Sequence, residues 1–336
     1  MTGPTASQVG RPPRVDAHVH LSAWWPEIRR TGYRLDLDYT IPGLIREMDR
    51  SRIDFALAIQ LFQAPSDEEA LAEGRRIFEK SGGRLLPVAT VDPTSGEDAV
   101  AASLRRIEQE PHLVGVKLFP GYRPFYPHDR RLEPVYELAH RRNLPILLHQ
   151  GDTLDGVGLL KFARPIEVDE VAVRYRDVRF VLCHLGNPWI EEAAEVVYKN
   201  PNVYTDTSGL LGPPSSPYFD RALEHCRERI ERAVIASGLP EHFLYGSDWP
   251  LEELATATGL IERLGLSNAD KAAILGGNAQ KLFGLLTKPS PADPRSLDPC
   301  GRSVPCEGRP SQSLRRNKPS PRSTPSGKGP VTGRNA

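Results

Sequence analysis

Two histidines stand one residue apart in the segment VDAHVH, residues 15–20. In a β-strand alternate side chains point to the same face, so His18 and His20 would project together, about 6.6 Å apart at a rise of about 3.3 Å per residue. Two imidazoles in that position can both reach one cation, because metal–nitrogen bonds are about 2.0–2.1 Å long. The same spacing also occurs in pairs of structural histidines, so the rest of the chain has to distinguish the two.

Further polar residues of ligand type follow short apolar runs elsewhere in the chain. The full set is His18, His20, His149, His184, Asp206 and Asp248, with Lys117 near the end of another run. Each histidine taken alone is more typical of a hydrogen-bonded core imidazole. If all of these groups converge, however, burying them without partners would cost several kcal/mol. A shared metal ion is therefore the expectation.

The apolar runs predict the fold that would bring these residues together. Eight strand-like runs, each followed by an amphipathic helical pattern, cover residues 14–20, 53–60, 84–91, 113–119, 144–150, 178–184, 202–208 and 242–248. Eight such units in about 270 residues predict an α/β fold, a (β/α)8 TIM barrel, in which the carboxyl ends of the strands meet at one mouth. A doubly wound open sheet is the alternative, but no GxGxxG follows the first run.

The two ends of the chain differ in composition from the segment between them. From Lys288 onward the chain has ten prolines, eight serines, ten Lys or Arg, three acidic residues and no aromatic residue. Such a segment cannot bury enough apolar surface to offset its ordering entropy. We therefore predict a disordered N-terminus (1–13), one barrel domain (14–287) and a disordered basic tail (288–336).

Charge and apolar content exclude several classes of protein. Because the whole chain is neutral and the tail has seven excess positive charges, residues 1–287 carry seven excess negative charges, which argues against nucleic-acid binding. No stretch approaches the roughly 18 apolar residues of a membrane span, and the first fourteen residues contain no signal-peptide pattern. The four cysteines have no zinc-ribbon or redox spacing. A cytoplasmic protein that acts on a small molecule is expected, and a homodimer remains open.

With these residues in place, the sequence resembles the amidohydrolase superfamily, and within it the amidohydrolase 2 branch that includes aminocarboxymuconate-semialdehyde decarboxylase-like enzymes. The resemblance extends through residues 14–287. It rests on DAHVH (16–20), GVKLFPGYRPFYPHD (115–129), PILLHQGDT (145–153), FVLCHLGNPW (180–189), NVYTDTSGL (202–210), YGSDWP (245–250) and GGNAQKLFGL (276–285).

The resemblance implies a role for several of these residues. In that family the positions of His18, His20, His149 and Asp248 surround one divalent metal, for which Zn²⁺ is the first expectation and Mn²⁺ or another divalent metal the alternative. The position of His184 contacts substrate or a bound water. Asp248 and His184 are therefore the predicted catalytic residues, since a metal-bound water near neutral pKa needs a proton acceptor and the developing negative charge needs a donor.

Lys117 and Cys183 each leave two interpretations open. Elsewhere in the superfamily a lysine at the position of Lys117 is carboxylated and bridges two metals, whereas this branch uses one metal. We expect Lys117 to be a substrate-facing cation or a structural ion-pair partner. Strand alternation predicts that Cys183, next to the inward-facing His184, points outward into the helix layer as a core residue.

Aromatic and cationic residues near the predicted mouth suggest a pocket for a small, anionic or aromatic molecule. The predicted substrate-binding residues are Lys117, Tyr122, Arg123, Asn187, Trp189 and Trp249. The same site chemistry allows three functions. The first is hydrolysis of an amide, ester or lactone; the alternative is non-oxidative decarboxylation of a small aromatic or unsaturated acid; the third is ligand binding without turnover, against which the intact ligand set argues.

Overall fold

The computed structural model describes residues 11–21, 37–61, 66–154, 156–212 and 214–285. The predicted terminal segments, 1–13 and 288–336, fall largely or wholly outside these residues, so the domain boundaries remain predictions. Among the helices of the described part, none is long and apolar enough to cross a membrane.

Eight parallel strands form one sheet in the order of the sequence, as the eight apolar runs predict. The strands are β1 (Val15–Val19), β2 (Phe55–Ile59), β3 (Leu85–Thr90), β4 (Gly115–Leu118), β5 (Ile146–Leu148), β6 (Phe180–Leu182), β7 (Val203–Asp206) and β8 (Phe243–Leu244). Backbone hydrogen bonds from Ala17 N to Tyr245 O (2.8 Å) and from His20 N to Trp249 O (2.7 Å) join the first strand to the segment after the last. The sheet is thus a nearly closed (β/α)8 barrel.

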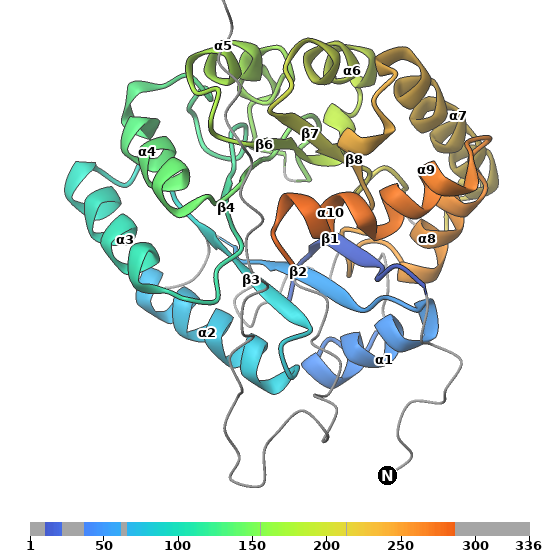
Figure 1. Cartoon of the computed structure of the whole chain (residues 1–336), viewed down its shortest axis with the longest axis horizontal. Helices are drawn as coiled ribbons and strands as arrows, with labels where there is room; N and C mark the ends of the chain where they lie inside the picture. The colour runs from blue at the N-terminus through green and yellow to red at the C-terminus, as the bar shows by residue number, and fades with distance from the viewer. Residues whose placement is uncertain (1–10, 22–36, 62–65, 155, 213, 286–336) are drawn as a thin grey trace, which may run out of the picture. The chain divides into compact units, whose positions relative to one another are not determined.

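Helices surround the ring of strands (Figure 1). They are α1 (Ile41–Ser51), α2 (Asp67–Lys80), α3 (Glu97–Gln109), α4 (Glu133–Arg142), α5 (Glu167–Arg174), α6 (Ile190–Lys199), α7 (Phe219–Ser237), α8 (Leu254–Glu262), α9 (Asn268–Ala272) and α10 (Asn278–Leu282). Local sequence fixes their ends: Ser66 caps α2 by accepting a hydrogen bond from the Glu69 N–H at 3.2 Å, and Gly82, with a φ of 63°, follows the helix. A serine at the start of a helix and a glycine after its end are common capping residues.

The core has two layers, because successive strand residues point to opposite faces. One layer lies between strands and helices and includes Ala56, Val116 and Phe180. The other fills the barrel interior and includes Leu57 and Val181, with residues of α10 packed into it. The barrel therefore supplies a rigid wall whose carboxyl end carries the polar residues discussed next.

Candidate metal centre

Because β1 is irregular, the side chains of His18 and His20 both point towards the same site. The pairing of β1 with β2 shifts register between Asp16 and Val19. Ala17 belongs to the interior layer, whereas Val19 packs in the outer layer, so His18 and His20 flank an outward-facing residue. Such a bulge redirects side chains at the end of a strand.

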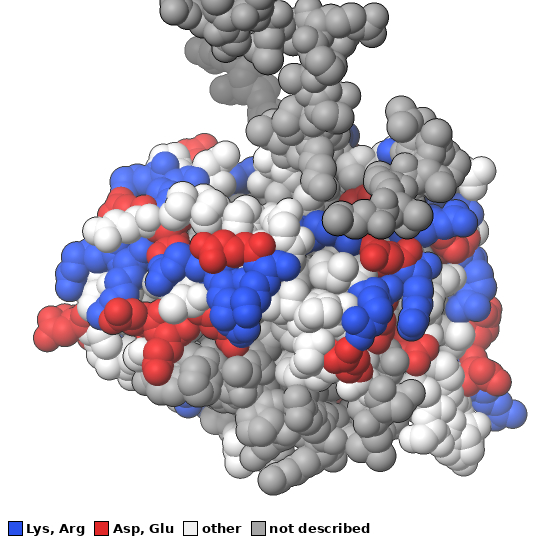
Figure 2. Space-filling view, turned by 90° about the horizontal axis from the view of Figure 1, so that it is seen from below, with Lys and Arg blue, Asp and Glu red and all other residues white. Residues whose placement is uncertain are grey.

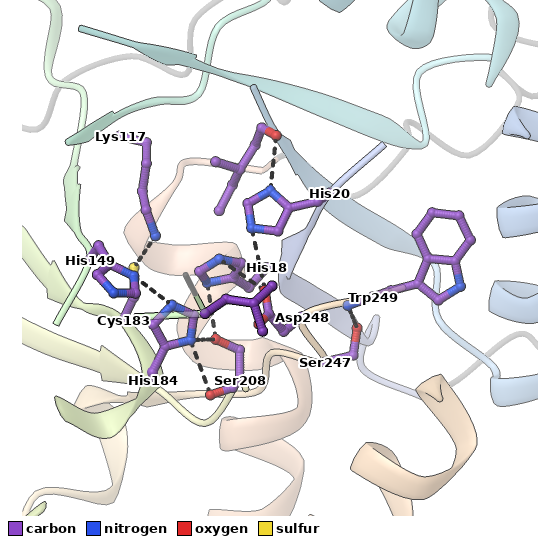
Figure 3. Close-up of polar contacts among 12 residues, drawn as sticks. His18, His20, Lys117, His149, Cys183, His184, Ser208, Ser247, Asp248 and Trp249 are labelled. Atoms are coloured by element: carbon purple, nitrogen blue, oxygen red, sulfur yellow. Dashed lines mark hydrogen bonds and ion pairs between the residues drawn. The ribbon is translucent and has the colours of Figure 1, made fainter. Parts of the chain in front are cut away.

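Backbone hydrogen bonds bring Asp248 next to these histidines. The Asp248 N–H donates to His18 O at 2.8 Å, and Asp248 has a left-handed backbone with a φ of 56°. As a result Asp248 Oδ1 lies 3.5 Å from His18 Nε2 and 3.3 Å from His20 Nε2 (Figure 3). All three residues are buried, and these distances are long for direct hydrogen bonds.

These three side chains have the donor set of a cation site. Their ligand atoms all lie within 4.8 Å of one another. His18 Nε2 and Asp248 Oδ1 have no hydrogen-bond partner within the described part of the chain, although both atoms are buried. Unsatisfied buried polar atoms that face a common point are expected where an ion completes their bonding. Imidazole nitrogens with one carboxylate oxygen fit a divalent transition metal.

Asp206 and Ser208, at the end of β7, orient His18. Asp206 Oδ2 lies 2.9 Å from His18 Nδ1, and Ser208 Oγ lies 3.0 Å from the same nitrogen. Asp206 Oδ1 also accepts the backbone N–H of His184 at 2.9 Å. A carboxylate on Nδ1 holds the proton there and leaves the Nε2 lone pair for a metal. In the sequence Asp206 is one of the ligand-type residues that follow apolar runs, but its type and position do not predict this orienting role, for which the short TDTSG segment was the available signal.

The charges of the buried groups match those of metal ligands. Burial, together with the positive charge of Lys117, lowers the pKa of His18 to about 3. Burial also lowers the pKa of His149 well below its usual value. Burial alone would raise the pKa of Asp248, but its close approach to His20 and to the other neighbouring histidines lowers it below the usual range. Neutral imidazoles beside an ionised carboxylate are the protonation states that metal binding requires.

His149 and His184 lie together beside this group. His184 Nε2 is 3.1 Å from His149 Nδ1, and the ring centroids are 4.8 Å apart. His149 Nε2 is 2.8 Å from Asp152 O, so both nitrogens of His149 are engaged. His149 would have to give up one of these contacts to bind a metal, and its place as the fourth ligand remains a prediction. The His184 ring also approaches that of His18, at 4.8 Å between centroids.

Lys117 lies inside the barrel next to Cys183. Its Nζ donates to Cys183 Sγ at 2.8 Å and lies 5.2 Å from the centroid of the Phe119 ring. Lys117 is fully buried, and burial raises the pKa of the Cys183 thiol, which is therefore uncharged. The expected outward direction of Cys183 is wrong. Its side chain follows Val181 into the interior, and the left-handed backbone of His184, with a φ of 61°, breaks the alternation on which that expectation rested.

Tyr122, a predicted substrate-binding residue, lies next to one of the site histidines. Its ring centroid is 4.7 Å from that of His149, and its hydroxyl accepts the Leu154 N–H at 2.7 Å. Arg123, the next residue, pairs its Nε with Asp92 Oδ2 at 2.9 Å. Tyr122 thus offers an aromatic face at the site, whereas Arg123 is engaged by an acidic partner.

In the contacts that the structure describes, Asn187 and Trp189 contact arginines rather than the three proposed metal ligands His18, His20 and Asp248. Asn187 Oδ1 accepts a hydrogen bond from Arg229 at 2.7 Å, and the guanidinium of Arg164 lies 5.3 Å from the Trp189 ring centroid. These contacts anchor the loop after β6. A substrate role for either residue remains a prediction without support from these distances.

Trp249 is fully buried in the outer core layer. Its ring stacks on Tyr39 with 5.3 Å between centroids, and in Figure 3 it lies apart from the imidazoles. The tryptophan therefore stabilises the segment after β8 that carries Asp248. These contacts do not bring its ring to the proposed metal ligands.

Comparison with known proteins places the chain in a family. Residues 15–285 match the sequence model of the amidohydrolase family. A gamma-resorcylate decarboxylase from Polaromonas sp. is 25% identical over 315 residues, which cover 78% of this chain and 91% of the relative. An L-fucono-1,5-lactonase from Burkholderia multivorans is 30% identical over 160 residues, covering 41% of this chain and 53%, about half, of the lactonase.

Solved structures show the same fold. An uncharacterized TIM-barrel protein from Bordetella bronchiseptica is similar with a TM-score of 0.64 and 19% identity, covering 81% of this chain and 99% of the other. A dihydroxybenzoic acid decarboxylase from Polaromonas sp., with bound manganese and 2-nitroresorcinol, is similar with a TM-score of 0.58 and 18% identity, covering 81% and 97%. Together with the match of the family model over most of the chain, the motifs and the barrel lead to one conclusion: this protein is an enzyme that belongs to the amidohydrolase family.

Proposed function

We propose that this enzyme is a metal-dependent decarboxylase of a small hydroxylated aromatic acid. The observation that carries the proposal is the similarity to a gamma-resorcylate decarboxylase along 91% of that relative, whereas the lactonase similarity covers 53%. The sequence alone favoured hydrolysis and kept decarboxylation as the alternative. The comparisons favour the alternative, so the order of the two hypotheses is reversed.

The proposed cofactor is one divalent metal ion held by His18, His20 and Asp248, with His149 as the predicted fourth ligand. When bound, the metal would neutralise and orient the carboxylate and neighbouring hydroxyl of the acid. Manganese bound in the decarboxylase from Polaromonas sp. supports Mn²⁺, and Zn²⁺ remains the other candidate for this donor set. Elemental analysis of the purified protein decides between them.

The side chains around the metal position supply the rest of the reaction. The bond between ring and carboxylate breaks, CO₂ leaves, and the electron pair stays on the ring carbon, which must take up a proton. We assign the donor to Asp248, which would have to take up a proton from solvent once the anionic substrate is bound, and the relay of that proton to His184, a neighbour on which the charge of Asp248 acts. The rings of Phe119 and Tyr122, each next to His149, would hold an aromatic substrate.

A small-molecule substrate also fits the surface. On the face shown in Figure 2, Lys and Arg side chains alternate with Asp and Glu side chains and do not gather into one basic patch. Sequence-independent binding of nucleic acid would need such a patch. Light scattering would determine whether the enzyme is the homodimer that the sequence leaves open.

The experiment compares two classes of substrate with one enzyme preparation. Full-length protein is stripped of metal, reloaded with Mn²⁺ or Zn²⁺, and incubated with 2,6-dihydroxybenzoate, other hydroxybenzoates and a panel of sugar lactones. We expect metal-dependent CO₂ release from a hydroxybenzoate, abolished by a chelator and by His18→Ala but not by the exposed-residue control His140→Ala. Lactone opening without any CO₂ release would overturn the proposal in favour of a hydrolase.

A further inference from the structure

Gly209 brings the backbone after β7 unusually close to two of the site residues. It has a φ of 63°, in the left-handed region. A Cβ at this position would lie 2.8 Å from Asp248 Oδ2 and 2.8 Å from His184 Nδ1. Real Cβ atoms do not approach other heavy atoms so closely, so any side chain here forces Asp248 or His184 to move.

Neither neighbour can move without losing contacts. His184 Nδ1 lies 2.9 Å from Ser208 Oγ and 3.2 Å from Ser208 O. The Asp248 backbone N–H is bonded to His18 O at 2.8 Å, and its carboxylate faces His18 and His20. A methyl group between the two would therefore displace a group that is already fixed on its other side.

A second glycine makes a related approach from the adjacent strand. A Cβ on Gly246 would lie 3.0 Å from His18 Cβ and 3.0 Å from Ser208 Cβ. Bare backbone from the ends of both β7 and β8 thus packs directly against the cluster of His18, His184 and Asp248. Close packing of this kind fixes side-chain positions, since interiors leave few voids into which a group can relax.

From this arrangement we infer that Gly209 is a positioning residue: its lack of a side chain sets the separation of His184 and Asp248. In this role Gly209 acts through these two side chains. The inference rests on the proposed function, which makes these two side chains the reacting pair, and it adds a residue on which their geometry depends. The competing explanation is that glycine is present only because the backbone needs a positive φ.

A matched variant separates these explanations. Gly82, in the loop before β3 at the other end of the strands, has the same φ of 63° but no heavy atom within 4 Å of a Cβ. Gly82→Ala carries the same backbone strain without crowding. We expect it to lower Tm by a few degrees and to leave kcat and metal content unchanged.

For Gly209→Ala we expect a further change at the site. In the metal-reloaded enzyme kcat should fall about 10²-fold, as for a displacement of about 1 Å of a reacting group. In the Co²⁺-substituted protein the visible absorption spectrum should shift, since Asp248 is a proposed ligand. A Gly209→Ala protein with the kcat and Co²⁺ spectrum of Gly82→Ala would overturn the inference.

A stability measurement on metal-free protein covers the case in which Gly209→Ala folds poorly. If His184 and Asp248 cause the crowding, Gly209→Ala should lower Tm less in a background that carries both His184→Ala and Asp248→Ala than in the parent. An equal loss in both backgrounds would show strain alone and overturn the inference. Neither this test nor the Co²⁺ spectrum depends on decarboxylation, so an inactive parent would refute the proposed function and leave the role of Gly209 to be judged separately.

Discussion

Replacing Asp206 by asparagine should weaken metal binding although Asp206 is not a proposed ligand. The Oδ1 atom of Asp206 accepts the backbone N–H groups of His184 and Ser208, at 2.9 and 3.1 Å, and Oδ2 faces His18 Nδ1 at 2.9 Å. An asparagine that keeps its oxygen on the two backbone groups turns its NH₂ towards His18. Two N–H donors cannot face each other, so His18 must move its proton to Nε2, the nitrogen proposed to bind the metal.

The expected loss of metal affinity can be estimated from the role of carboxylates that orient a metal-binding histidine. Loss of the partner that orients a ligating histidine costs about 10–100-fold in metal affinity. At about 1.4 kcal/mol per tenfold change, this is about 1.4–2.8 kcal/mol. Stability of the metal-free protein should change less, because the asparagine oxygen keeps both backbone hydrogen bonds.

Competition with a chromophoric chelator measures the metal affinity of parent and variant directly. Asp169→Asn is the control, since Asp169 is an ion-pair partner of the exposed Lys199 at 2.6 Å on the helix side of the barrel. If Asp206→Asn binds metal as tightly as Asp169→Asn, then Asp206 does not set the tautomer of His18, and the reasoning is refuted.

Three further predictions concern His184, the acid stability of the metal-free protein, and the tail. His184→Asn should lower turnover by about 10²–10⁴-fold with metal content nearly intact, measured on one preparation by assay and elemental analysis; loss of metal along with rate would make His184 a ligand. Because the folded pKa of His18 is about 3 and the unfolded value 6.5, the unfolded chain binds an extra proton between these values. Stability is therefore lost as pH falls from 6.5 towards 3, by up to about 1.4 kcal/mol per pH unit. His18→Asn should show a shallower pH dependence in urea unfolding between pH 6.5 and 5, and equal slopes would count against a buried neutral imidazole. Truncation before Lys288 should leave Tm and turnover unchanged, and a Tm several degrees lower would show that the tail packs on the barrel.

The sequence by itself was sufficient for the architecture and the main ligand candidates. All eight strands lie within the apolar runs, because buried parallel strands need continuous apolar residues and each run has a helix after it. Since the carboxyl ends of barrel strands meet at one mouth, the positions of His18, His20 and Asp248 in the sequence were enough to predict that they converge.

The tertiary structure decided what periodicity cannot encode. The bulge in β1 and the positive φ values of His184 and Asp248 are backbone departures from regular strand geometry, so alternation gave the wrong direction for Cys183. Such departures are stabilised by neighbours that are distant in the sequence, such as the hydrogen bond from Asp248 to His18 O.

Periodicity also could not predict which residues of different loops contact one another. The partners of Arg123, Asn187 and Trp189 come from other loops and helices, and residue type alone predicted pocket positions for all three. The contact of Asp206 with His18 spans 188 residues, and the approach of Gly209 to His184 depends on how the segment after β7 folds back towards the end of β6. Residue types and strand order determined which groups reach the mouth of the barrel, and only the packed loops determined which of them touch.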